Sequence, residues 1–242
     1  MTEPVQEPQF QRALVIAAHE DDAEFMCAGT VARWARQGKE ITYVLATSGE
    51  RGSSDPLMTP DRLGAIRREE QREACRILGV RHLEFLGYPD QYVQNTLALR
   101  MDMARQIRRY RPDLVVVADP TQRWFSNVYL NHPDHRAVAD AALDAVYPSA
   151  RDYHAFPTLI KEGLMPHITR YVLVQTTPDQ ANLWVDITDT LEVKLAALRC
   201  HLSQVDAEAM QIEEFVRGYG RMTAGAQGMA YAECFRLIDM GA

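Results

Sequence analysis

Short apolar runs alternate with longer segments of helical spacing along the first half of the chain. Residues 13–18 form a continuous apolar run, which is typical of a strand buried in a parallel sheet. Residues 23–37 place their apolar side chains at helical spacing, and Gly38 ends that segment. Residues 39–47 predict a second strand. Strand, helix and strand fill about 35 residues, the size of a βαβ unit with parallel strands.

The alternation continues to about residue 146. Helices are predicted over 59–78 and 96–110, and strands over 82–86 and 114–117, whereas 121–130 is expected to be irregular. This order predicts an α/β protein with a Rossmann-like, doubly wound, mostly parallel sheet. Helices should cover both faces, and the active site should lie at the carboxyl ends of the strands.

The second half of the chain has less regular patterning. Residues 151–166 contain several prolines and aromatic side chains, which predicts a lid or an interface arm. Strands are predicted over 171–175 and 183–187, and helices over 188–202 and 207–219. The length indicates one domain over 1–242, with residues 1–11 as a loose lead-in.

Composition narrows the function classes. The net charge of −7, without any basic block, argues against nucleic acid as a partner. No apolar run reaches the roughly 18 residues of a membrane span, and the acidic N-terminus does not resemble a secretory signal. The four cysteines are scattered and are interpreted as reduced thiols of a cytoplasmic protein: Cys27, Cys75, Cys200 and Cys234.

The first predicted strand ends at an unusual cluster of polar residues, His19-Glu20-Asp21-Asp22. Three acids beside one imidazole repel each other unless a positive charge lies among them, and a divalent metal would supply that charge. The alternative is an ordinary helix N-terminus, where the helix dipole favours acidic side chains.

A second cluster, His132-Pro133-Asp134-His135, opens a helix predicted to reach about Val146. Its histidines are three residues apart, which places both rings on one helix face. Surface capping would also explain them. Since both clusters open a helix and His19 directly follows a buried strand, we expect them to meet at one edge of the predicted sheet. Two histidines and one aspartate would hold a metal with room for water, and the remaining carboxylates could accept protons, as metal-assisted hydrolysis requires.

These motifs resemble those of the LmbE-like or PIG-L family of zinc-dependent N-acetylglucosaminyl deacetylases. The family's Ala-His-Pro-Asp-Asp motif corresponds to residues 18–22, and its His-Pro-Asp-His motif is intact at 132–135. The resemblance extends over almost the whole chain, through matches at 47–52, Arg67 and Glu70, 186–188, Lys194, 203–204 and 231–236.

The resemblance implies one zinc ion per chain, held by His19, Asp22 and His135. It implies Asp21 as the general base. It also implies that His132 stabilises the oxyanion or protonates the leaving amine. Asp134 would then orient His132, and Arg67 would contact an N-acetylated sugar. Fe²⁺ suits the same ligands. A homo-oligomer is expected from the resemblance and from apolar residues in 151–170.

The chain departs from the family pattern at two positions. Glu20 replaces the motif proline, and we expect it to face solvent; the alternatives are that it binds a substrate amine or hydroxyl, or raises the pKa of Asp21. A tyrosine that assists the oxyanion in some relatives corresponds to Leu130 here, with Tyr129 beside it, so this role is assigned to neither.

Several other residues have two interpretations. Arg51, in a glycine-rich loop, is either a solvated side chain or a hydrogen-bonding group for sugar hydroxyls or phosphate. Asp119 either supports a metal-bound histidine or closes a turn. Trp124 and Phe125 form either a sugar-stacking wall or a packing surface.

Other functions compete with removal of an acetyl group. A relative could cleave a different amide, such as that of a thiol S-conjugate or an acylated sugar. A non-catalytic Rossmann-like binding protein is a further alternative, but the first turn lacks G-x-G-x-x-G and carries acids where a pyrophosphate would lie. A non-catalytic family member is the last alternative, and the intact ligand set with Asp21 argues against it.

Overall fold

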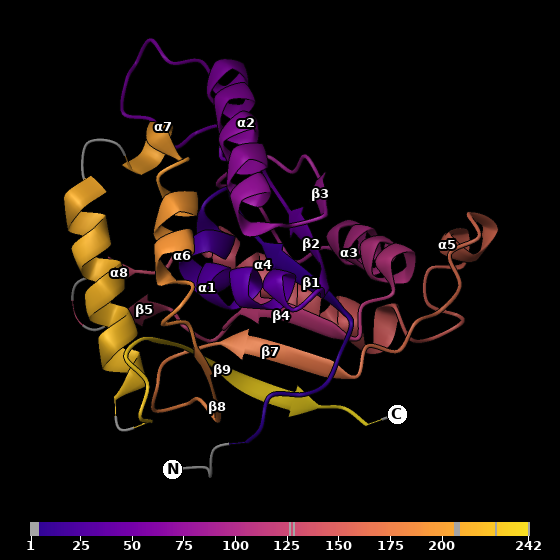
Figure 1. Cartoon of the computed structure of the whole chain (residues 1–242). Helices are drawn as coiled ribbons and strands as arrows, with labels where there is room; N and C mark the ends of the chain where they lie inside the picture. The colour runs from indigo at the N-terminus through magenta and orange to yellow at the C-terminus, as the bar shows by residue number, and fades with distance from the viewer. Residues whose placement is uncertain (1–4, 126, 128, 206–208, 226, 242) are drawn as a thin grey trace.

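A computed structural model of the chain describes residues 5–125, 127, 129–205, 209–225 and 227–241. The first four residues of the expected lead-in, and residues 207–208 of the last predicted helix, lie outside this described part. The main sheet has seven strands in the order β3-β2-β1-β4-β7-β9-β8 (Figure 1). Strands β1, β2, β3, β4 and β7 are parallel, which confirms the predicted mostly parallel sheet.

The strands follow the apolar runs of the sequence because these runs are buried between two layers of helices. Val15 and Val116 are fully buried at paired positions of β1 and β4. The main-sheet strands are β1 (Arg12–Ala17), β2 (Glu40–Leu45), β3 (His82–Phe85), β4 (Leu114–Ala118), β7 (Tyr171–Gln175), β8 (Leu183–Asp186) and β9 (Ala232–Asp239).

Strand β9 was not predicted. It lies antiparallel between β7 and β8. Its carboxylate Glu233 is buried, accepting hydrogen bonds from the backbone N–H groups of Gly29 and Thr30 and pairing with Lys194 at 2.6 Å. A buried charge inside the strand hides the apolar pattern of its first half.

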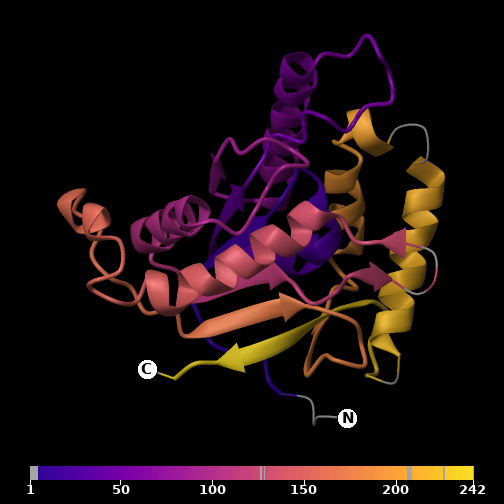
Figure 2. The same ribbon diagram turned by 180° about the vertical axis from the view of Figure 1, so that it is seen from behind.

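Helices cover both faces of the sheet, as expected (Figures 1 and 2). One buried cluster joins the sheet to α1, α2 and α6, and the other joins it to α3 and α4. Helix α8 packs against α6 through Val216. The helices are α1 (Asp22–Arg36), α2 (Pro60–Leu78), α3 (Leu97–Tyr110), α4 (Pro133–Asp144), η1 (Ala145–Ser149), α5 (Pro157–Lys161), α6 (Leu191–Leu198), α7 (Leu202–Val205) and α8 (Ala209–Ala224).

Three predicted segments differ from the structure. The segment 121–130, expected to be irregular, contains the two-stranded hairpin β5 (Trp124–Phe125) and β6 (Tyr129–Leu130). The helix expected over 188–202 is shorter, since α6 extends only from Leu191 to Leu198 and a separate helix, α7, begins at Leu202. The segment 151–166 connects η1 to the amino end of β7, and α5 extends from the body on the side away from the hairpin (Figure 2). The lid interpretation of this segment is therefore wrong.

Among the described residues, none of the helices combines the length and the apolar character needed to span a membrane.

Candidate metal centre

The two predicted motifs meet at the carboxyl ends of β1 and β4. These strands are neighbours, and the chain proceeds from β1 toward β2 on one side and from β4 toward β7 on the other. Such a reversal of strand order leaves a crevice in which open α/β sheets bind their ligands. His19 follows β1, and His132 is the N-cap of α4.

Three potential ligand atoms converge in this crevice. Nδ1 of His19 lies 3.2 Å from Nε2 of His135. Oδ2 of Asp22 lies 3.4 Å from the first atom, and Oδ1 of Asp22 lies 3.0 Å from the second. Ligands bound at about 2.0–2.1 Å around a tetrahedral zinc ion are about 3.3–3.4 Å apart, so the two nitrogens and the Asp22 carboxylate are close enough to share one ion.

The charge around His19 also fits a cation. Burial lowers the pKa of His19, but hydrogen bonds with Asp134, Asp22 and Asp90 outweigh burial and raise the pKa to about 12. The pocket therefore stabilises positive charge strongly. The same negative charges would stabilise a metal ion held beside the ring.

Carboxylates also lie on the far side of the His19 ring. Asp90 is 3.0 Å and Asp134 is 3.3 Å from Nε2 of His19. Two sets of side chains in the described part of the chain have ligand atoms close enough to hold a cation: His19, His132 and His135, and His19, Asp90, His132 and Asp134. We favour the ion at Nδ1, because two carboxylates at hydrogen-bond distance from Nε2 suit a ring N–H, which is how metal-binding histidines are commonly held.

Asp90 was missed by sequence analysis. It lies in the loop after β3, where Tyr88-Pro89-Asp90 is typical of a turn. Burial raises its pKa, but the hydrogen bond and charge of His19 and a backbone N–H from Arg51 together lower the pKa of Asp90 to about 2. The available signal was its position after a predicted parallel strand.

Asp21 lies at the N-cap of α1 in the left-handed region, with φ of 81°. Its backbone N–H donates to Gln71, and Nη2 of Arg67 lies 3.5 Å from its carboxylate. Burial raises the pKa of Asp21 to about 6 despite the opposing charge of Arg67. Its neighbour Asp22 accepts backbone N–H groups from Ala18 and His19, which fixes the turn that joins β1 to α1.

The expectation that Glu20 faces solvent is wrong. Its side chain is 0% exposed and lies 3.5 Å from Nε of Arg67. Arg67 itself is 4% exposed and donates to the carbonyl oxygens of Glu20 and Gly49. A Cβ at Gly49 would lie 2.4 Å from the guanidinium, and φ there is +52°, so glycine is required. Arg67 thus holds the rim loop against the first motif, and its predicted substrate contact stays a prediction.

A backbone N–H group within the second motif orients the ring of His132. Nδ1 of His132 accepts the N–H of Asp134, so in the neutral ring the proton lies on Nε2. The carboxylate of Asp134, which was expected to orient His132, lies closer to His19 than to His132, whose Nδ1 is 4.0 Å away. Its orienting role toward His132 stays a prediction. The side-chain oxygen of Asn131, a residue that sequence analysis did not assign to the site, lies 2.9 Å from Nδ1 of His135.

Arg51 lies beside this centre. Its backbone N–H donates to Asp90, and its guanidinium lies 4.8 Å from the ring centre of Tyr92. Its predicted substrate contact stays a prediction.

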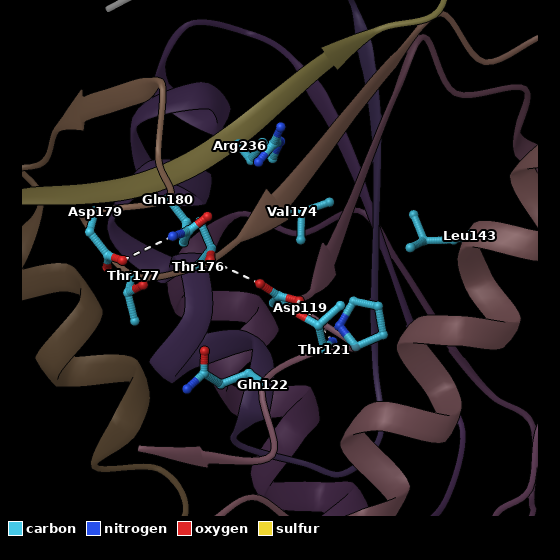
Figure 3. Close-up of a pocket in the computed structure, with 11 residues that line it drawn as sticks. Asp119, Thr121, Gln122, Leu143, Val174, Thr176, Thr177, Asp179, Gln180 and Arg236 are labelled. Carbon is cyan, nitrogen blue, oxygen red and sulfur yellow. Dashed lines mark hydrogen bonds between the residues drawn. The ribbon is translucent and has the colours of Figure 1, made fainter. Parts of the chain in front are cut away.

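A cavity of about 550 Å³ opens one strand further along the same edge, after β4 and β7 (Figure 3). Asp119 lines it and accepts hydrogen bonds from Thr121 and Thr176, which supports its interpretation as a turn residue. The carbonyl of Gln122, another lining residue, accepts from Asn131. The cavity and His135 are therefore linked through a single side chain.

Comparison with known proteins identifies the family. The model of the family described as PIG-L, GlcNAc-PI de-N-acetylase, matches residues 14–146, which include both motifs. The chain belongs to the PIG-L family. Diacetylchitobiose deacetylase of Thermococcus kodakarensis is 32% identical over 233 residues, covering 94% of this chain and 83% of the relative.

Other PIG-L relatives agree with this assignment. The solved N,N'-diacetylchitobiose deacetylase of Pyrococcus horikoshii is 32% identical, with a TM-score of 0.87, and the match covers 95% of this chain and 84% of that one. A probable N-acetyl-α-D-glucosaminyl L-malate deacetylase of Bacillus anthracis is 27% identical over 86% of this chain and 87% of its own length. The family resemblance of the motifs is thereby confirmed.

Proposed function

We propose that this protein is a metal-dependent deacetylase that removes the acetyl group from an N-acetylglucosamine-type amide. The observation that carries the proposal is the convergence of His19, Asp22 and His135 within 3.0–3.4 Å, next to the partly buried carboxylate of Asp21, which is not needed as a ligand. His19, Asp22 and His135 would hold one zinc ion; Fe²⁺ suits the same donors. When bound, the ion supplies Lewis acidity, which activates water and polarises an amide carbonyl.

Different side chains of the protein would carry out the remaining chemical roles. Asp21 would accept a proton from the attacking water, and Arg67 favours its anionic form across 3.5 Å. His132 would donate a hydrogen bond from Nε2 to the carbonyl oxygen as negative charge develops there, since its Nδ1 accepts the N–H of Asp134 and the ring is therefore neutral. The alternative expectation, that His132 protonates the amine, would require a proton on both ring nitrogens, so the amine would instead receive the proton that Asp21 takes from water as the C–N bond breaks. Asp134 and Asp90 would hold the ring of His19.

The test is release of acetate by zinc-loaded protein from a panel of N-acetylhexosamine conjugates, with products identified by mass spectrometry. Asp21→Asn should keep its zinc and lose about 10²- to 10⁴-fold in turnover. Asp61→Asn, a change of an exposed acid in the first turn of α2, is the matched control. Absence of acetate from every conjugate would remove the substrate assignment, and unchanged turnover by Asp21→Asn would remove the assigned base.

The same assay separates the alternatives. Cleavage of a thiol S-conjugate or another acylated sugar would give a different product mass. Binding of NAD to metal-free protein, without hydrolysis, would favour a Rossmann-like binding protein. Four further expectations stay predictions: substrate contacts of Glu20, Arg51 and Arg67, a cytoplasmic location, one domain over 1–242 and a homo-oligomer.

A further inference from the structure

Helix α2 holds one peptide unit of the first motif from both ends. The carbonyl of Glu20 accepts a hydrogen bond from Nη2 of Arg67 at 2.7 Å, and the N–H of Asp21 donates to Oε1 of Gln71 at 3.3 Å. The carbonyl and N–H of a trans peptide point in opposite directions. Arg67 and Gln71 are four residues apart and therefore lie on the same face of α2. Together they fix the plane of the peptide that joins Glu20 to Asp21.

This peptide leads into a residue with an unfavourable backbone conformation. Asp21 has a φ of 81°, in the left-handed region. Residues other than glycine rarely adopt this region, and they remain there only where the surrounding structure enforces it. The backbone angles also set the direction in which the side chain leaves the chain. The hydrogen bonds that hold this conformation therefore also determine where the Asp21 carboxylate lies.

Gln71 is in turn oriented by two buried side chains. Its Nε2 donates to Oε1 of Glu24 at 2.9 Å, and the other carboxylate oxygen of Glu24 lies 3.3 Å from Nε2 of His201. Gln71, Glu24 and His201 are all fully buried. Because an ionised carboxylate can only accept hydrogen bonds, Glu24 selects the orientation in which the amide nitrogen faces it and the amide oxygen faces the N–H of Asp21.

We propose that Gln71, oriented by Glu24 and His201, is a positioning residue that holds Asp21 in the conformation required of the general base. This inference rests on the proposed function, which assigns the base to Asp21. Because Gln71 is fully buried, it acts through the backbone of Asp21 and not on the substrate. Displacement of the base should lower turnover more than substrate affinity, since a shift of about 1 Å in a reacting group can cost about 100-fold in rate.

The first test compares kcat with KM. Gln71→Met removes both hydrogen bonds of the amide at similar side-chain volume. With zinc-loaded protein and the N-acetylhexosamine conjugate that the parent cleaves fastest, kcat should fall about 10- to 100-fold, whereas KM and zinc content should stay within about twofold of the parent. Gln106→Met, the matched change of a buried glutamine on α3, should leave kcat within about twofold of the parent.

Exchange of two side chains separates positioning from a general loss of packing. In the double variant with Glu24→Gln and Gln71→Glu, the carboxylate at position 71 can still accept the N–H of Asp21. The amide at position 24 can donate to that carboxylate and accept from His201. Turnover should therefore return to within about fivefold of the parent. Gln71→Glu alone places two carboxylates together and should not restore it. Thermal unfolding verifies that each variant is folded.

Amide hydrogen exchange measures the hold on Asp21 without any substrate. Loss of its hydrogen bond in Gln71→Met should speed exchange of the Asp21 N–H about five- to tenfold. The N–H of Leu99, which is bonded to the side chain of Thr96 at the start of α3, should exchange at the parent rate and serves as the control.

The outcomes separate this inference from the proposed function. Unchanged exchange at Asp21, an unchanged kcat in Gln71→Met, or a loss of turnover that the double variant does not restore would each overturn the positioning role. Faster exchange at Asp21 in Gln71→Met, in a protein whose parent form releases no acetate, would support the hold on Asp21 and reject the deacetylase. Acetate release that Gln71→Met leaves unchanged would do the reverse.

Discussion

The carboxylate of Asp90 lies 3.0 Å from Nε2 of His19, on the side of the ring opposite to Asp22 and His135. Asp90 comes from the loop after β3, two strands away from β1 along the chain and in the sheet. Its backbone N–H is in turn held by Glu50, from the loop after β2. Three consecutive strand ends therefore contribute to the position of one imidazole.

This relationship predicts an effect of Asp90 on metal affinity. Asp90→Asn removes the charge that orients His19 and increases its basicity, so zinc affinity should fall about 10- to 100-fold. Competition with a chromophoric chelator measures the zinc affinity. Asp119→Asn changes an acid that follows the neighbouring strand and is bound to Thr121 and Thr176, so it should keep the parent affinity. Equal affinities for Asp90→Asn and the parent would exclude the proposed support of His19.

Metal binding should also stabilise the fold, because the three ligands meet only in the folded chain. Zinc at a hundred times its Kd adds about 2.7 kcal/mol. For a chain of this size that raises Tm by about 5–10 °C. Scanning calorimetry with zinc and with a chelator measures the difference. The increase in Tm caused by zinc should vanish in His135→Gln. It should persist in His82→Gln, because this histidine begins β3 at the opposite end of the sheet. A zinc-dependent Tm in His135→Gln would place the ion elsewhere.

The sequence was informative where one local pattern determines structure. Strands β1, β2 and β4 are apolar runs, and the helix predicted over 59–78 is α2, whose N-cap Thr59 accepts the N–H of Arg62 through its side chain. The two motifs could be placed at one edge because parallel strands share a direction. Asp90 could not be recognised, since its role depends on a histidine 71 positions earlier, between 19 and 90 in the numbering.

Glu20 illustrates the same difficulty. A lone glutamate at a strand end is normally exposed. Arg67, which the fold brings against Glu20 from α2, offsets part of the cost of its burial, but burial still raises the pKa of Glu20 to about 7. Strand β9 was missed for a similar reason, because its Glu233 is compensated by Lys194 of α6. Partners that are distant in sequence leave no periodic pattern.

The pair of Glu20 and Arg67 leads to a prediction for stability. Arg67→Met leaves the buried carboxylate of Glu20 without its cation and should cost about 3–5 kcal/mol of unfolding free energy. Glu20→Gln in the same chain removes the stranded charge, so the double variant should lose about 0.5–3 kcal/mol less than the sum of the single changes. Urea unfolding measures each value.

A control for this cycle lies on the same helix. Arg72 pairs with Glu69 on the exposed face of α2, and such pairs are worth at most about 1 kcal/mol. Arg72→Met should therefore change stability little. Additive losses in Glu20→Gln and Arg67→Met would mean that the two side chains do not stabilise each other.

A second buried pair should make stability depend on pH. His201 is fully buried 3.3 Å from Glu24. Burial lowers its pKa, but the ion pair with Glu24 and the charges of Asp21 and Glu70 raise the pKa overall. The folded state therefore holds a proton that an unfolded histidine releases near pH 6.5. The resulting stabilisation is complete below that pH and is lost as pH rises toward the folded pKa, by at most about 1.4 kcal/mol per pH unit.

Urea unfolding of zinc-loaded protein from pH 6 to 9 tests this dependence. The difference in stability between the parent and His201→Gln should be largest at pH 6 and should shrink as pH rises, because only the parent loses its proton-linked contribution. His82→Gln, a change of an exposed histidine, should follow the parent at every pH. A constant difference between the parent and His201→Gln would mean that His201 is neutral in the folded protein and that Glu24 is balanced by its hydrogen bond from Gln71 alone.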